Sequence, residues 1–315
     1  MKKCSWKNKK YRSIDYKNVL LIRRGFEMLQ ELTFGRLENE FYNKKATEKD
    51  FVICIDKGKI LLNRKSETEV MYPTVDAVKA WAKEDGWNPW REDPFQYVFR
   101  MQEKDYYLWL GECDKSADAA YQYEEIRQLS VFETKDACFA ACTANHLYVW
   151  YRNNRFCGGC QTPTVHDTKE RMLRCPKCGN LIFPRISPAV IIGVTNGEKL
   201  LLSKYAGRAY TRYALIAGYT EIGETMEETV KREVMEEVGL RVKNIRYYKS
   251  QPWGRDGAVL MGFFCDLDGS DEIHLDEKEL ALAEWHDRHA LPAHDDGISL
   301  TREMMRVFEE GREPK

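Results

Sequence analysis

Hydrophobic and polar residues alternate with two different periods along the first half of the chain. A period of two predicts strands in 51–63 (FVICIDKGKILLN), around a turn at Lys57-Gly58, and in 97–112 (YVFRMQEKDYYLWLGE). A helical period is present in 74–86 (TVDAVKAWAKEDG) and in 135–154 (KDACFAACTANHLYVWYRNN). This half is therefore predicted to be an α+β domain, and it contains no recognisable catalytic constellation.

The second half has longer apolar runs separated by turn signals. The run 189–204 (AVIIGVTNGEKLLLSK) predicts a hairpin, because Asn196 and Gly197 both tolerate a positive φ. Further strands are predicted at 213–219, 241–253 and 258–268, and helices at 223–240, ended by Gly239, and at 299–311. Strands interleaved with two helices predict a mixed sheet between helical layers, an α/β/α sandwich, within an overall α+β class.

Composition limits the size and the partners of the protein. The chain has 315 residues with 43% hydrophobic content, enough for more than one folded unit. Its 49 basic and 50 acidic residues leave a net charge of −1, which gives no electrostatic footprint for nucleic acid or anionic membrane. The basic start, MKKCSWKNKKYR, lacks the apolar core of a secretory signal, and a solvated start is favoured over a transit peptide. No run approaches the roughly 18 apolar residues of a membrane span, so we expect a cytoplasmic protein.

Four of the ten cysteines form two CxxC pairs, CGGC and CPKCG. Each gap of two residues lets both thiolates of a pair face one ion, and the neighbouring glycines permit the tight turns. Disulfides are the alternative, which a reducing compartment disfavours. We therefore predict a structural Zn²⁺ whose coordination shell is closed by Cys157, Cys160, Cys175 and Cys178. A ribbon that binds nucleic acid is a further possibility, although the local charge is not strongly basic.

The other cysteines and two histidines have ordinary structural interpretations. The six scattered cysteines (Cys4, Cys54, Cys113, Cys138, Cys142 and Cys265) are predicted to be small buried hydrophobic residues. His146, in an aromatic-rich helical stretch, is predicted to be a packed core histidine. His166, between the two CxxC pairs, is predicted to lie on the surface.

The stretch GETMEETVKREVMEEVGL (223–240) places six glutamates in eighteen positions. At 100° per residue, Glu233 and Glu237 border an apolar stripe and Glu236 lies beside them. Like charges at this spacing repel, and burying them without compensation is costly. A solvated acidic face is the ordinary alternative. A hard divalent cation such as Mg²⁺ or Mn²⁺ would remove the repulsion, because such ions take carboxylate oxygens and keep substrate phosphates as further ligands.

The spacing around this stretch resembles the Nudix box at every defined position. Gly218 is followed after five residues by Glu224, and after seven more by the run Arg232-Glu233-Val234-x-Glu236-Glu237-x-Gly239-Leu240. With each residue type near ~5–7% abundance, a chance match is below about one in a million. The resemblance implies a loop–helix–loop that binds divalent metal and hydrolyses a nucleoside diphosphate linked to another group. It implies that Glu233, Glu237 and the Ala217 carbonyl bind metal, that Glu236 binds metal or assists, and that Glu224 pairs with Arg232.

Three further features together resemble the NADH pyrophosphatase (NAD⁺ diphosphatase) family from about residue 95 onward: ACTANHLYVWYRNNRFCGGC, the position of the CxxC pairs directly before the box, and Ser250-Gln251-Pro252-Trp253 after it. The resemblance implies hydrolysis of NAD(H) to NMN(H) and AMP, removal of NAD caps from RNA 5′ ends, and a homodimer. It divides the chain into an N-terminal domain (1–152), a zinc ribbon (153–182) and a Nudix domain (183–315). The family roles carried over are a substrate contact for Phe183, Tyr219, Gln251, Trp253 and Thr301, and a metal contact for Glu279. For each aromatic residue, ordinary core packing is the alternative.

The sequence departs from the family pattern after Trp253. The family continues with Pro-Phe-Pro-x-Ser, whereas this chain continues with Gly254-Arg255-Asp256-Gly257-Ala258. Arg255 could bind a phosphate or favour a different second half of the substrate. Two alternatives therefore stay open beside an NAD(H) diphosphatase: a Nudix hydrolase of ADP-ribose or dinucleoside polyphosphates, and a non-catalytic zinc-ribbon binding or regulatory protein. The sequence gives no role for residues 1–90.

Overall fold

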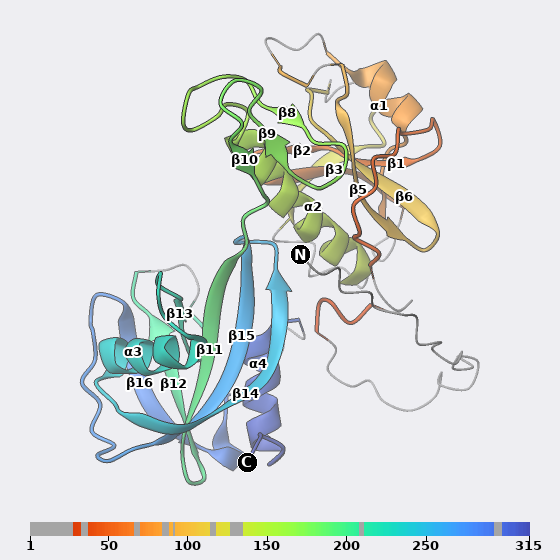
Figure 1. Ribbon diagram of the computed structural model, residues 1–315. Coiled ribbons are helices and arrows are strands. Elements are labelled where there is room, and N and C mark those ends of the chain that lie inside the picture. The colour runs from red at the N-terminus through yellow and green to blue at the C-terminus, as the bar shows by residue number, and fades with distance from the viewer. Residues whose placement is uncertain are drawn as a thin grey trace, which may run out of the picture.

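The chain folds into two lobes, joined by the segment 183–186 that leads into strand β11, and the N-terminal lobe carries the ribbon (Figure 1). The computed structural model describes residues 28–32, 37–65, 70–83, 88–90, 92–113, 118–126, 135–207, 211–292 and 298–315. Cys4 lies outside these ranges. The helices are α1 (Val75–Trp81), α2 (Lys135–Asn153), α3 (Met226–Val238) and α4 (Leu300–Glu309), with a 3-10 turn η3 at Arg288–Ala290. The strands are β1 (Phe51–Ile53), β2 (Ile55–Asp56), β3 (Lys59–Arg64), β4 (Val70–Met71), β5 (Phe95–Met101), β6 (Lys104–Trp109), β7 (Gln122–Glu125), β8 (Val165–His166), β9 (Leu173–Arg174), β10 (Leu181–Ile182), β11 (Ser187–Asn196), β12 (Lys199–Tyr205), β13 (Ile216–Tyr219), β14 (Val242–Trp253), β15 (Ala258–Leu267) and β16 (Leu280–Asp287).

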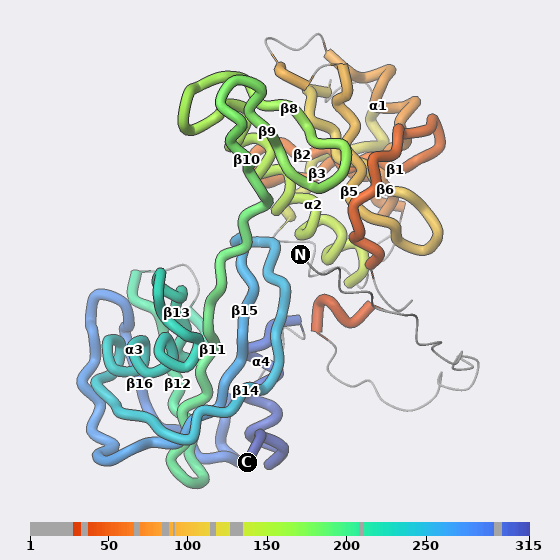
Figure 2. Tube along the Cα trace, in the orientation of Figure 1, coloured from red at the N-terminus to blue at the C-terminus, as the bar shows by residue number. Residues whose placement is uncertain are grey.

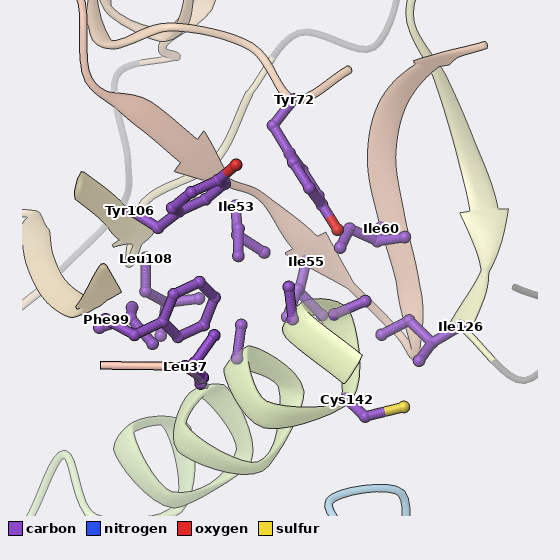
Figure 3. Packing of buried hydrophobic residues seen from close by; sticks show 14 of the residues in the cluster. Leu37, Ile53, Ile55, Ile60, Tyr72, Phe99, Tyr106, Leu108, Ile126 and Cys142 are labelled. Carbon is purple, nitrogen blue, oxygen red and sulfur yellow. The ribbon is translucent and has the colours of Figure 1, made fainter. Parts of the chain in front are cut away.

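Two small sheets and helices α1 and α2 form the N-terminal lobe, which confirms the α+β prediction for this half. The sheets have the orders β1-β6-β5 and β2-β3-β4, with β7 paired to β3. The predicted turn at Lys57-Gly58 closes the β2–β3 hairpin, with φ of 49° and 79°. Apolar side chains from both sheets meet the buried face of α2 in one core, which Figure 3 shows with Cys142 among its members.

The ribbon strands β8, β9 and β10 form a sheet that packs onto the N-terminal lobe. Leu173 is fully buried in that lobe's core. Arg171 Nη1 and Nη2 donate to the carbonyls of Tyr97 and Val98 at 3.1 and 2.7 Å. Since a segment with few apolar residues cannot build its own core, this contact supplies part of the ribbon's stability.

The surface prediction for His166 is wrong. Its ring packs against Trp90 and Tyr151, with centroids 5.1 and 5.4 Å away. Burial lowers the pKa of His166 to about 4, so the imidazole is neutral near pH 7. The sequence of the ribbon could not predict this burial, because the aromatic residues that cover His166 come from outside the ribbon.

The C-terminal lobe is a mixed sheet between two helices, as predicted. Its strand order is β14-β15-β11-β12-β16, and β13 also pairs with β11. Side chains alternate along β11, so that Val190 and Ile192 face α3 whereas Ile191 faces α4. The Cα trace in Figure 2 shows α3 and α4 on opposite faces of this sheet.

Two details of this lobe differ from the predictions. Strand β16 was not predicted, because LALAEWHD lies in a charged stretch and forms one edge of the sheet. In the β11–β12 hairpin, Asn196 pairs with Lys199, so the two loop residues are Gly197 and Glu198, and the glycine takes the positive φ of 59°. Asn196 therefore ends a strand rather than entering the turn.

The segment 28–32, near the start of the chain, packs against the C-terminal lobe as well as against the core of its own half. Met28 is buried in the cluster that also contains α4. The Leu29 N–H donates to the Ile298 carbonyl at 3.3 Å, and Gln30 Nε2 to the Ser250 carbonyl at 3.4 Å.

Within the described ranges, no helix is long and apolar enough to span a membrane.

Candidate active site

The ends of α3 are fixed by side chains that the sequence supplies. The Thr225 hydroxyl accepts from the Glu228 N–H at 3.2 Å, and the Glu228 carboxylate accepts from the Thr225 N–H at 2.8 Å, a reciprocal capping box. Gly239 ends the helix with φ of 69°. A Cβ at Gly239 would also lie 2.8 Å from the Cβ of His274, so a close approach adds a second need for glycine.

Two of the three clustered glutamates are buried on this helix. Glu233 and Glu237 are 8% and 3% exposed, whereas the side chain of Glu236 is 59% exposed. Burial raises the pKa of Glu233, and the nearby Glu236 and Glu279 carboxylates add to the effect. This arrangement favours a cation close to Glu233, because a positive charge would relieve both burial and repulsion.

Arg232 braces the loop against the helix. Its Nε and Nη2 donate to the two oxygens of Glu224 at 2.6 and 3.0 Å, and Nη2 also donates to the Tyr219 carbonyl at 2.9 Å. These bonds hold the pKa of Glu224 at about 2, so the pair is ionised at neutral pH. Arg232 Nη1 further donates to Glu233 at 2.7 Å and to Glu236 at 2.9 Å. The predicted pairing of Glu224 with Arg232 is present in the structure.

Gly218 gives the Glu233 carboxylate its place. A Cβ on Gly218 would lie 1.9 Å from Glu233 Cδ and 2.0 Å from its Oε1. No side chain other than hydrogen therefore fits between β13 and this carboxylate. The box glycine is required for close approach and not for an unusual φ.

Gly218→Ala is expected to displace the Glu233 carboxylate and to reduce the hydrolysis that the Nudix resemblance implies by at least about tenfold, while the thermal midpoint changes little, because a flexible side-chain end yields before the backbone. Gly193→Ala is the matched comparison on β11. Its Cβ would lie 2.7 Å from the Phe264 ring in the core, so it should lower the midpoint more than the turnover. Steady-state kinetics and thermal melts of both variants check this, and the reverse pattern would contradict it.

A pocket of about 860 Å³ opens beside Gly218 and Glu233. Several residues singled out from the sequence line it together: Ala217, Gly218, Tyr219, Glu233, Trp253, Arg255, Glu279 and Thr301. They come from β13, α3, the β14–β15 turn, the loop before β16 and the start of α4. The geometry thus brings a carboxylate, exposed aromatic rings and a guanidinium to one cavity, which suits a substrate with both charged and aromatic parts.

The loop that carries Glu279 is tied to the end of α3. The His274 N–H donates to the Val238 carbonyl at 2.9 Å, and the Asp276 N–H donates to the Glu237 carbonyl at 2.9 Å. These backbone bonds bring Glu279 to the pocket that Glu233 lines. Since they involve main-chain atoms, no residue type in the sequence announces them.

Two predicted substrate contacts lie elsewhere. Gln251 is fully buried: its Nε2 donates to Gln30 Oε1 at 3.0 Å and to the Ile298 carbonyl at 2.8 Å, and its Oε1 accepts from the Leu300 N–H at 2.8 Å. Its assignment as a substrate-binding residue is therefore wrong, because its polar atoms face the protein interior and hold the start of α4. Phe183 is exposed and lines a neighbouring cavity of about 1050 Å³.

Sequence reasoning did not single out Tyr205 and Arg212, whose side chains also line the pocket. Tyr205 ends β12, and Arg212 lies in the connection from β12 to β13. Nothing in the local pattern marks them, because each reaches the pocket only through the sheet order.

The four ribbon cysteines bring their sulfurs together. The Sγ–Sγ distances are 3.6 Å for Cys157–Cys178, 3.4 Å for Cys160–Cys175 and 3.6 Å for Cys160–Cys178, and the four sulfurs all lie within 4.8 Å of one another. A tetrahedral Zn²⁺ with Zn–S bonds near 2.3 Å would place its sulfurs about 3.8 Å apart. A hydrogen bond with Thr162 lowers the pKa of Cys160 to about 6, which favours the thiolate that binds metal.

Comparison with known proteins agrees with both motifs. A family model described as NUDIX domain matches residues 185–308, and one described as NADH pyrophosphatase zinc ribbon domain matches residues 152–183. A protein of Pasteurella multocida named NAD-capped RNA hydrolase NudC is 35% identical over 186 residues, which cover 58% of this chain and 69% of that protein. The chain belongs to the NADH pyrophosphatase family of Nudix proteins.

Two further relatives are also named NAD-capped RNA hydrolase NudC. The relative from Chromobacterium violaceum is 40% identical over 167 residues, 53% of this chain and 63% of that protein. The relative from Pseudomonas aeruginosa is 37% identical over 165 residues, 52% of this chain and 59% of that protein. The match thus spans less than two thirds of these two Nudix relatives. A crystal structure of a Nudix hydrolase from Nitrosomonas europaea covers 50% of this chain and 94% of that chain, with a TM-score of 0.44 and 24% identity.

Proposed function

We propose that the protein hydrolyses the pyrophosphate bond of NAD(H) to NMN(H) and AMP. The observation that carries the proposal is the buried Glu233 carboxylate seated against Gly218, in a pocket that Tyr219 and Trp253 also line. An aromatic ring on each nucleotide and a diphosphate between them match these surfaces. The zinc-ribbon match and the names of the relatives support a nicotinamide dinucleotide, free or as the cap of an RNA.

The donor set beside the pocket fits a hard divalent cation. Glu233, Glu236, Glu237 and Glu279 offer carboxylate oxygens, and Ala217 offers a carbonyl oxygen. Oxygen-only sets select Mg²⁺ or Mn²⁺ over softer ions. Because Gly218 has no Cβ, the Glu233 carboxylate can lie directly against β13, and this close approach allows the oxygen atoms to share one ion. When bound, the ion would neutralise phosphate oxygens and lower the pKa of a water molecule.

The residues of the chain itself supply positioning. The Glu224–Arg232 pair fixes the loop after β13 and, through the Tyr219 carbonyl, the ring that faces the substrate. Tyr219 is 54% exposed and is therefore free to stack on a base. Thr301 and Arg255 line the same cavity and would contact the rest of the dinucleotide. A box glutamate would accept the proton of the attacking water.

The ribbon would hold one structural Zn²⁺, because its four thiols leave no position for substrate. We further propose three units, 1–152, 153–182 and 183–315, a cytoplasmic location, and a homodimer in which Phe183 reaches the partner's site. The exposure of Phe183 (53%) and Ile186 (60%) beside the neighbouring cavity supports such a contact.

A second candidate function is hydrolysis of ADP-ribose or dinucleoside polyphosphates. The observation that favours it is the Gly254-Arg255-Asp256-Gly257 turn, whose Arg255 and Asp256 line the pocket. A guanidinium at this end would favour an additional phosphate over a neutral ring. A non-catalytic role is disfavoured by the burial of both Glu233 and Glu237, because a divalent cation would offset the cost of burying two carboxylates.

Side-by-side hydrolysis of NADH, NAD⁺, ADP-ribose, diadenosine polyphosphates and NAD-capped RNA, with Mg²⁺ or Mn²⁺ and product identification, tests the choice. The expected result is that the nicotinamide dinucleotide, free or as a cap, has a higher kcat/KM than the other substrates and yields AMP or 5′-monophosphate RNA together with NMN(H). Absence of NMN(H) from every nicotinamide substrate would discard the leading proposal in favour of the second.

A further inference from the structure

The turn between β14 and β15, residues 254–257, lies against one face of helix α2 from the other lobe. A Cβ on Gly254 would lie 2.4 Å from the Cys142 carbonyl oxygen, so the turn approaches the helix backbone as closely as only glycine allows. Arg255 Nη2 lies 3.9 Å from Cys138 Sγ. Gly257, at φ of 69°, faces the His146 ring, where a Cβ would lie 3.2 Å from Nε2.

The three helix residues in these contacts, Cys138, Cys142 and His146, follow one another at intervals of four. Residues at this spacing share one face of a helix. We call them the α2 face. The two glycines that replace the family's stiffer turn are thus the residues that fit this face, and the departure of the sequence from the family has a physical reason.

The same turn also forms part of the pocket. Trp253, Arg255 and Asp256 all line it. Trp253 Nε1 donates to Asp256 Oδ2 at 2.9 Å, and the Arg255 guanidinium lies 5.3 Å from the centre of the Trp253 ring. The indole, the guanidinium and the carboxylate therefore form one linked group, which contacts α2 through Arg255 and lines the pocket.

His146 joins this turn to the segment that leads into β11. Its Nε2 lies 2.6 Å from the Arg185 carbonyl. Since a carbonyl only accepts, Nε2 carries the proton and donates. The Ser187 N–H in turn donates to the Gly257 carbonyl at 2.9 Å. His146 thus contacts the turn and the residues that lead into β11, whose Ala189 and Ile191 line the pocket. Its prediction as a packed core histidine is wrong, because it is half-buried between the two lobes.

We propose that the α2 face positions the substrate turn, and that His146 is a positioning residue for the half of the substrate bound at Trp253 and Arg255. The N-terminal lobe would then set affinity for the second nucleotide while the glutamate site performs the chemistry. This inference rests on the proposed hydrolysis of a dinucleotide. The N-terminal lobe would thus contribute to substrate binding, a role that neither the Nudix box nor the zinc ribbon fills.

The test compares His146→Ala, His146→Gln and Arg152→Ala in the full-length, zinc-loaded protein. His146→Ala removes the N–H donor and should raise KM for NADH by about 3- to 10-fold, with kcat within about twofold. His146→Gln keeps a donor and should restore most of the affinity. Arg152 is exposed on α2, outside the α2 face, and its variant should match the parent protein. A general loss of fold would lower the active fraction and kcat without raising KM.

Hydrogen–deuterium exchange of the 250–260 segment without substrate gives a readout independent of the proposed function. His146→Ala should speed exchange of the amides of residues 254–257, and Arg152→Ala should not. If the parent protein leaves NADH uncut, the proposed function fails, and the exchange result still decides whether His146 holds the turn. Unchanged exchange in His146→Ala would overturn the positioning role. Faster exchange with an unchanged KM for a cleaved dinucleotide would also overturn it.

Discussion

Glu237→Gln is expected to reduce turnover at least about 100-fold and to leave the fold intact. Glu237 is 3% exposed on α3, and glutamine has nearly the same volume, so packing is retained. The substitution removes one negative charge from the oxygen set that would hold a divalent ion. Such an ion contributes several kcal/mol to transition-state stabilisation, and each ~1.4 kcal/mol is a factor of ten in rate.

Glu227→Gln is the matched control for this variant. It makes the same substitution in the first turn of the same helix, at an exposed position outside the pocket lining. Initial rates over a range of Mg²⁺ and Mn²⁺ concentrations, with circular dichroism of both variants, separate lost chemistry from lost fold. If turnover in Glu237→Gln stayed within about twofold of the parent protein, Glu237 would not be a ligand of the metal ion.

Cys175→Ser is expected to abolish zinc binding and to lower the thermal midpoint by roughly 10 °C or more. Cys175 is 1% exposed and belongs to the four-sulfur cluster. Loss of the ion would also affect the N-terminal lobe, because ribbon residue Leu173 is buried in that lobe's core and Arg171 bonds its β5 backbone. A local change in the ribbon thus becomes a loss of stability in the whole lobe.

Cys113→Ser controls for the change of sulfur to oxygen. Cys113 is also buried, at 8% exposure, but lies beside Cys54 in another cluster and contacts no ribbon sulfur. Metal analysis should find one zinc per chain in Cys113→Ser and none in Cys175→Ser. Retention of zinc and of the parent midpoint in Cys175→Ser would show that this thiol is no ligand.

Local signals predicted much of the fold and the centre of the site. Gly239 was predicted to end α3, and it does so; the Lys57-Gly58 turn lies between its two strands as predicted. The Glu224–Arg232 pair could be predicted from the resemblance to the Nudix box, because both residues lie in one continuous loop and helix. These features depend on residues close in the chain.

What the sequence did not reveal depends on contacts between distant segments. Gln251 followed the family motif, yet its amide faces Gln30, 221 residues away, and the start of α4. The contact between the 254–257 turn and α2 forms only because the two lobes pack against each other. His146 and His166 differ in the same way from their predictions, since the partners of each ring come from outside its own helix or ribbon. A pattern read along one strand or helix contains no such information.

The most direct test of the account is the hydrolysis of NADH by the full-length, zinc-loaded protein, first without added divalent ion and then with Mg²⁺ or Mn²⁺. The account predicts AMP and NMNH in equal amounts, formed only when the ion is present. Intact NADH under every ion, with no other nucleotide diphosphate derivative cleaved, would contradict it.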